Sequence, residues 1–212
     1  RGPLGRPPSL GFHESQSRLW ENWVGRSGPF AASLLPILRE EMPGRFDDVD
    51  AEALRRASCK AGPSPIRVEA DEVTYNLHIA LRFELELALF EGTLEPAELP
   101  EAWAELTRSY LGIEIADASE GVLQDVHWAA GAFGYFPTYS LGNLIAAQLW
   151  ELAAADDPAL TEKTALGELG PLRDWLVAKL HRHAGTMLPA ELADRVLGGP
   201  IEAEPLLRHL RA

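Results

Sequence analysis

The first group of residues with a clear capacity for chemistry is the run Gly11-Phe-His13-Glu14-Ser-Gln16-Ser17. It begins like H-E-x-x-H, the signature in which two histidines one helical turn apart bind zinc and the glutamate activates water. Here the fifth position is Ser17, and no other H-E-x-x-H occurs in the 212 residues. The run therefore offers one carboxylate, Glu14, but not a two-histidine site. Without further context, Glu14 would be expected to pair with Arg18, one helical turn away.

A second group begins at Ile66-Arg67-Val-Glu69-Ala and continues into a long apolar segment. Four polar residues follow at i, i+4, i+7 and i+11, on one face of a helix: Asp71, Tyr75, His78 and Arg82. A polar stripe on an apolar helix costs desolvation free energy unless its members pair with one another or serve a site. For Arg67 the simpler alternative is a salt bridge to Glu69 or Asp71.

The third group is Gly121-Val-Leu-Gln124-Asp125-Val-His127-Trp128, followed by a run of glycines and aromatic residues that contains Tyr135 and Tyr139. Its composition predicts a rigid loop that presents aromatic rings and hydroxyl groups. The alternatives are that His127 is a buried structural histidine and that the aromatic residues serve packing alone.

Helices are expected to position these groups. Apolar residues at helical spacing, N-cap residues and first-turn prolines predict helices over 12–24, after Asp50, after Pro100, over 141–152, after Pro171 and after Pro189. Residues 73–89 alternate with period two, which is typical of a strand, but the segment is far longer than the usual ~5–6 residues. We therefore predict a buried helix over 66–90, with a short extended lead-in at Ile66–Val68, and a mainly α fold.

Composition narrows the classes of partner. The formal net charge is −13, which argues against binding to nucleic acid or to an anionic membrane surface. No apolar run approaches the ~20 residues needed to span a bilayer, and the start of the chain lacks the apolar core of a signal peptide. The single cysteine, Cys59, excludes an internal disulfide. We expect a cytoplasmic protein that binds peptides, small molecules or other subunits.

The three groups resemble the H-E-S-Q, I-R-x-x-A-D and G-x-x-Q-D-x-H-W motifs of the thermostable metallocarboxypeptidase family M32, in the same order. The resemblance runs through nearly the whole chain. It implies a multi-helix, zincin-like fold, with a small β-sheet near the site as an open alternative. It also implies that residues 1–212 are a single C-terminal catalytic and substrate-binding portion of a larger enzyme, which removes single residues from the free C-terminus of peptides with broad tolerance.

The resemblance further implies roles for individual residues. Glu14 matches the family's third zinc ligand, and Arg67 matches an arginine that could bind the substrate's terminal carboxylate through two parallel hydrogen bonds. His127, with Tyr135 or Tyr139, is a candidate to stabilise an oxyanion or contact substrate. The remaining matched polar residues are expected to orient these groups or the metal ligands: His13, Gln16, Asp71, Gln124 and Asp125.

The chain also departs from the family, because the H-E-x-x-H helix with its two histidine ligands has no counterpart in these residues. The intact enzyme would hold zinc or cobalt, but we expect this truncated chain to bind zinc weakly or not at all and to lack peptidase activity alone. A homodimer is a further expectation from the resemblance. The alternative hypothesis is a non-catalytic α-helical module that binds peptides or another subunit.

Overall fold

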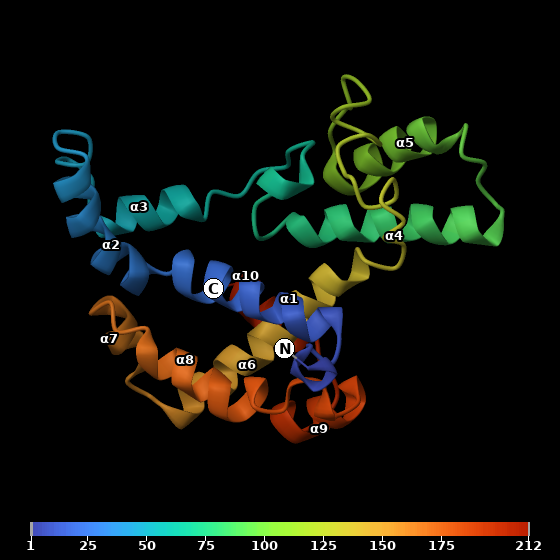
Figure 1. Cartoon of the computed structure of the whole chain (residues 1–212). Helices are drawn as coiled ribbons and strands as arrows, with labels where there is room; N and C mark the ends of the chain where they lie inside the picture. Colours follow the sequence, from blue (N-terminus) through green and yellow to red (C-terminus); the bar gives the residue numbers. More distant parts are fainter. Residues whose placement is uncertain (1, 212) are drawn as a thin grey trace. The chain divides into compact units, whose positions relative to one another are not determined.

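A computed structural model describes residues 2–211 of the protein (Figure 1). Within this range the chain forms ten α-helices, with short 3-10 and π-helical segments and no β-strand. The predicted mainly α fold is therefore confirmed, whereas the small β-sheet considered near the site is not formed by these residues. Across the same range, no helix is both long enough and apolar enough to cross a membrane.

Contacts divide the chain into two compact units. The first unit combines the residues up to Cys59 with those from Leu141 onward, and the second runs from Lys60 to Ser140. The group that contains Glu14 lies in the first unit, and the groups that contain Arg67 and His127 lie in the second.

The first unit is built around α6, whose range is Pro137–Asp156 and which begins in the second unit. Its other α-helices are α1 Leu10–Arg18, α2 Gly28–Glu41, α3 Ala51–Ser58, α7 Leu160–Ala165, α8 Gly170–Leu176, α9 Pro189–Leu197 and α10 Glu204–Arg211. π-Helical segments extend α1 over Leu19–Gly25 and α8 over Val177–His181. The shared core includes Phe12, Leu19, Trp23, Ile145, Leu149, Leu172, Leu176 and Leu192.

Polar caps explain where several helices begin. Ser9 accepts a hydrogen bond from Phe12 N at the start of α1, and Asp50 does the same for Ala53 N at the start of α3. Helix α2 is not among the predicted helices, and it contains two prolines, Pro29 and Pro36. Pro29 lies in the first turn of α2, where no backbone donor is needed, whereas Pro36 is tolerated inside it.

The second unit pairs α4, Tyr75–Glu91, with α5, Leu99–Leu111, and a long loop then leads to α6 (Figure 1). The lead-in predicted as extended is extended at Ile66 but forms a 3-10 turn over Arg67–Glu69. The period-two pattern belongs to α4, which is apolar on most sides: Leu81 and Leu85 are buried, whereas Phe83 and Leu87 are exposed. A period-two apolar pattern can therefore belong to a helix, and the buried face of α4 also carries charged residues.

Gly142 sets the distance between α6 and α1. A methyl group at this position would lie 2.8 Å from Cβ of Glu14 and 3.0 Å from the Glu14 carbonyl carbon. Backbone atoms cannot move aside as a flexible side chain can, so the two helices approach this closely because residue 142 has no side chain. The backbone position of Glu14 thus depends on this contact.

We expect Gly142→Ala to lower the free energy of unfolding by about 1–3 kcal/mol, because the methyl group overpacks the helix contact. Urea unfolding followed by circular dichroism would measure the change. Gly170→Ala is the matched control, since a methyl group there meets no heavy atom within 4 Å. Equal stability of the two variants would contradict the proposed close contact.

Candidate functional site

Helix α4 carries a line of buried polar side chains into the second unit. Tyr75, His78, Arg82 and Glu86 are 5%, 1%, 0% and 6% exposed. Three of them belong to the stripe predicted from the sequence, and Glu86 extends it by one more turn. Burial of charged groups at this level is tolerated when each charge is paired or hydrogen-bonded.

Asp125 is shared by two buried arginines. Its Oδ1 accepts hydrogen bonds from Arg67 Nε at 3.0 Å and Nη2 at 2.7 Å, and its Oδ2 accepts one from Arg82 Nε at 2.7 Å. Arg67 also donates to the Tyr75 hydroxyl at 3.1 Å, and Arg82 donates to the carbonyl of His78 at 2.8 Å. Two guanidiniums and one carboxylate leave this ion-pair group with a net positive charge.

Gln124 and Asp71 hold the segment that carries Arg67. The Gln124 Oε1 accepts from the backbone N of Arg67 at 2.9 Å, and its Nε2 donates to the carbonyl of Pro65 at 3.0 Å. Asp71 accepts from Thr74 Oγ1 at 2.6 Å and from the backbone N of Gly62 at 3.2 Å. Both side chains therefore act on the backbone around Arg67 and the start of α4.

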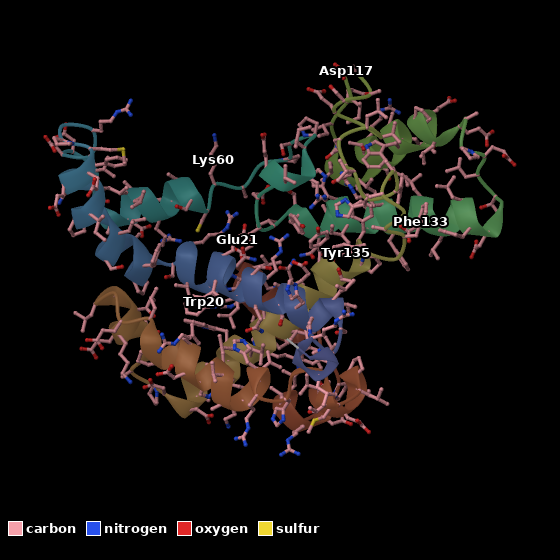
Figure 2. All side chains as sticks on the ribbon, viewed as in Figure 1. Trp20, Glu21, Lys60, Asp117, Phe133 and Tyr135 are labelled. Atoms are coloured by element: carbon pink, nitrogen blue, oxygen red, sulfur yellow. The ribbon has the colours of Figure 1, made fainter. Side chains whose placement is uncertain are left out.

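His127 lies among aromatic rings on the loop before α6. Its Nε2 is 3.1 Å from the Tyr139 hydroxyl, and its ring centroid is 5.3 Å from that of Tyr135 and 4.4 Å from that of Phe136. Its Nδ1 is 3.7 Å from Asp125 Oδ1, which is beyond hydrogen-bond distance. Figure 2 shows the side chains of this loop as sticks, with Tyr135 labelled. The structure thus brings together His127, Tyr135 and Tyr139, as well as Arg67 and Asp125.

Charge and burial shift the protonation of this group. Burial opposes ionisation of Asp125, but the hydrogen bond from Arg67 and the charge of Arg82 outweigh it and hold the Asp125 pKa below its ordinary 3.8. Burial lowers the pKa of His127, and the two arginines lower it further against the opposing charge of Asp125. His127 is therefore more readily neutral than an exposed histidine.

His78 is buried next to the same charges. Burial lowers its pKa to about 4, and the positive charges of Arg82 and Arg67 add to this effect. Its Nε2 is buried without a hydrogen-bond partner in the part of the chain that the structure describes. His78 is neutral at physiological pH and contributes no charge to the group around Asp125.

The other predicted site residues lie in the first unit, on α1. The Glu14 side chain is 14% exposed, and its Oε2 accepts a hydrogen bond from Ser17 Oγ at 3.1 Å. His13 is 63% exposed in its side chain, with its Nδ1 3.9 Å from Glu14 Oε1. Arg18, considered as a partner of Glu14, donates to Glu21 at 2.9 Å.

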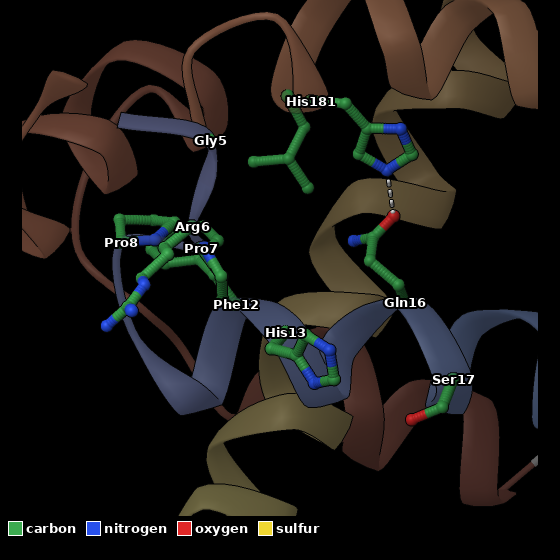
Figure 3. Close-up of a pocket in the computed structure, with 10 residues that line it drawn as sticks. Gly5, Arg6, Pro7, Pro8, Phe12, His13, Gln16, Ser17 and His181 are labelled. Carbon is green, nitrogen blue, oxygen red and sulfur yellow. Dashed lines mark hydrogen bonds between the residues drawn. The ribbon is translucent and has the colours of Figure 1, made fainter. Parts of the chain in front are cut away.

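Gln16 faces a cavity of about 430 Å³ in the first unit. Its Oε1 is 2.8 Å from Nε2 of His181, which also lines the cavity (Figure 3). Its Nε2 donates to Ser15 Oγ at 2.9 Å. Two buried apolar residues, Phe12 and Leu180, also line the cavity. Gln16 therefore contacts His181, another residue that lines this cavity.

The residues that the structure describes do not form a zinc site by themselves. Catalytic zinc in proteins is held by three side-chain ligands of histidine, cysteine or carboxylate type. Within residues 2–211, no three such side chains lie close enough together to hold a metal ion. Glu14 alone supplies one carboxylate, so the described residues do not fit a complete metal site.

Two residues of the site, Arg82 and Glu86, do not follow from the sequence motifs. Arg82 lies on the predicted polar stripe without a predicted role, and Glu86 is not among the predicted site residues. The signal for Glu86 was its spacing, because it follows His78 and Arg82 at i+8 and i+4 on the same face. A charged residue at a position otherwise expected to be buried was the available clue.

Known proteins match this chain over nearly its whole length. The model of the family described as carboxypeptidase Taq (M32) metallopeptidase matches residues 1–212. Thermostable carboxypeptidase 1 of Thermus thermophilus is 51% identical over 208 residues, covering 98% of this chain and 41% of that protein. The Pyrococcus furiosus protein of the same name is 41% identical over 209 residues, covering 99% of this chain and 42% of that protein.

Solved structures agree with the sequence matches. The M32 carboxypeptidase from Deinococcus radiodurans R1 superimposes with a TM-score of 0.94 at 40% identity, covering 99% of this chain and 42% of that one. A structure of the Pyrococcus furiosus carboxypeptidase gives a TM-score of 0.95 at 41% identity, covering 99% and 42%. This chain therefore spans about two fifths of the length of the relatives that it matches.

The low pKa of His78 predicts a pH dependence of stability. Between pH 6.5 and about 4 the unfolded chain protonates this histidine while the folded chain does not, so the free energy of unfolding falls as the pH falls. Over this range, protonation of His78 should lower the free energy of unfolding of the unsubstituted chain by about 3 kcal/mol. We expect this decrease to be absent in His78→Gln. Urea unfolding at a series of pH values would measure it.

His13→Gln is the matched control, because the side chain of His13 is 63% exposed. This variant should keep the pH dependence of the unsubstituted chain. If His78→Gln kept it as well, the buried neutral state of His78 would be refuted.

Proposed function

Because this chain belongs to the carboxypeptidase Taq (M32) metallopeptidase family, we propose that it is part of a zinc-dependent carboxypeptidase. The proposed reaction is the hydrolytic release of single residues from the free C-terminus of peptides, with broad specificity. The observation that carries the proposal is the family match over residues 1–212. The group around Asp125 supports it, since its net positive charge suits an anionic ligand.

Arg67 is the proposed ligand for the terminal carboxylate of the substrate. An arginine carries five N–H donors, and three of those of Arg67 are directed at Asp125 and Tyr75. Two donors thus retain the capacity to bind a carboxylate, and Asp125 fixes the plane of the guanidinium. A fixed guanidinium loses less conformational entropy when it binds a planar anion.

His127 and the two tyrosines are proposed to act on the scissile carbonyl. Donors placed in advance around a developing oxyanion stabilise it because they need no reorganisation during the reaction. In the contact between His127 Nε2 and the Tyr139 hydroxyl one group donates to the other, which orients both, and Tyr135 lies beside the same imidazole. The aromatic surroundings of His127 restrict water around these groups.

Glu14 is proposed as one zinc ligand, with the other ligands supplied by polypeptide outside these 212 residues. No step of the reaction is derived through the metal, because the described residues do not form its site. The likeness to the family also leads us to propose a homodimer and a cytoplasmic location. The free thiol of Cys59 is compatible with a reducing compartment.

The gene sequence discriminates this enzyme from a non-catalytic helical module. We expect the codons upstream of Arg1 to encode H-E-x-x-H in the same reading frame, because Glu14 by itself cannot hold zinc. DNA sequencing of that region tests the expectation. A start codon directly before Arg1 would support the module that binds peptides or a subunit without cleaving them.

The role of Arg67 predicts selectivity for a free peptide C-terminus. A short peptide should bind at least about tenfold more tightly than the same peptide with a C-terminal amide, because the amide lacks the charge that strengthens the hydrogen bonds. We expect Arg67→Lys to abolish this difference. Isothermal titration calorimetry on the chain provides the measurement.

Arg108→Lys is the control for this experiment. Arg108 lies in the same unit and makes an ion pair with Glu114, but both side chains are exposed, at 57% and 71%. The variant should retain the preference for the free carboxylate. Equal affinity of the unsubstituted chain for the two peptides would overturn the role given to Arg67.

A further inference from the structure

We propose that Glu86 is a positioning residue that holds His127 and Tyr135 at their mutual distance. Its importance for catalysis rests on the proposed carboxypeptidase function, whereas its effect on geometry does not. One carboxylate oxygen accepts a hydrogen bond from Trp128 Nε1 at 2.7 Å, and the other accepts one from the backbone N of Gly134. Trp128 directly follows His127, and Gly134 directly precedes Tyr135.

The loop between these two attachment points is short and turned back on itself. Gly131 N donates to the carbonyl of Trp128 at 2.9 Å, and Ala132 N donates to the carbonyl of His127 at 2.8 Å. Gly131 and Gly134 have φ of +73° and +70°, which favour glycine. The loop therefore brings residues 128 and 134 close enough for a single carboxylate to bind both.

Helix α4 supplies the rigid support. Arg82 lies one turn before Glu86 and binds Asp125, two residues before His127. Glu86 binds Trp128, one residue after His127. The histidine is thus held on both sides by two side chains of the same helix. Trp128 is further restrained by the ring of Trp103, with centroids 6.1 Å apart.

The two hydrogen bonds require a carboxylate. Glu86 is 6% exposed and has no ion-pair partner among residues 2–211, so N–H donors must compensate its buried charge. An ionised carboxylate accepts at both oxygens, whereas a glutamine amide accepts at one and donates at the other. Glutamine has the same shape but would direct a donor at either Trp128 or Gly134.

Nuclear magnetic resonance of the 212-residue chain tests the proposal without requiring peptidase activity. In Glu86→Gln we expect hydrogen exchange of the Gly134 amide or the Trp128 indole N–H to accelerate at least about tenfold. We also expect the nuclear Overhauser contact between the rings of His127 and Tyr135 to weaken. Glu84→Gln is the matched control, since Glu84 is exposed on the same helix and bonds to Tyr110.

A second variant separates positioning from general loss of structure. Trp128→Phe removes the competing donor, so in Glu86→Gln/Trp128→Phe the amide oxygen can bind Gly134 again. Protection of the Gly134 amide should then exceed that in Glu86→Gln alone, which general destabilisation does not predict. Unchanged exchange and an unchanged His127–Tyr135 contact in Glu86→Gln would overturn the proposal. If peptidase activity is never found, a positive result still establishes the positioning.

Discussion

Asp125 shares its carboxylate between Arg67 and Arg82, and the candidate site in the second unit is organised around this interaction. All three side chains are nearly inaccessible to water, at 8%, 7% and 0% exposure. Removal of one partner from such a group leaves an uncompensated buried charge, which is among the most costly changes that a protein can undergo. The shared carboxylate also sets the direction of the Arg67 guanidinium and joins the His127 loop to α4. The burial of Asp125 therefore links stability to the geometry of the site.

Helix α4 makes this arrangement tolerable because Arg82, Glu86 and Tyr75 on its buried face each have hydrogen-bond partners. Arg82 lies over the ring of Trp103, with 4.5 Å from its Cζ to the ring centroid, and adds a cation–π contact to its ion pair. Glu86 binds two N–H groups, and Tyr75 accepts from Arg67. Apolar residues on the remaining faces contribute burial that offsets the desolvation of the charges.

The first unit contributes the carboxylate of Glu14 through a different constraint. Its backbone position depends on close packing between α1 and α6, for which Gly142 is required. The two units thus hold their functional groups in different ways, one through helix packing and the other through buried charge. Both the helix packing and the buried ion pairs restrict the movement of the functional groups, as expected for groups that must be in position before a ligand binds.

The sequence by itself determined the helical class, most helix positions, the family and the polar stripe of α4, because periodicity, caps and motifs are local properties of the chain. It did not reveal α2, since Pro29 and Pro36 are ambiguous without their surroundings, and it left the sheet as an open alternative.

Tertiary structure decided which partner each polar residue takes. Arg67 could have paired with Glu69 or Asp71 nearby, but it binds Asp125, which is 58 positions further along the chain. Similarly, Glu86 meets Gly134 across 48 positions. Such pairings follow from how helices and loops pack together, and no local pattern of residues specifies them.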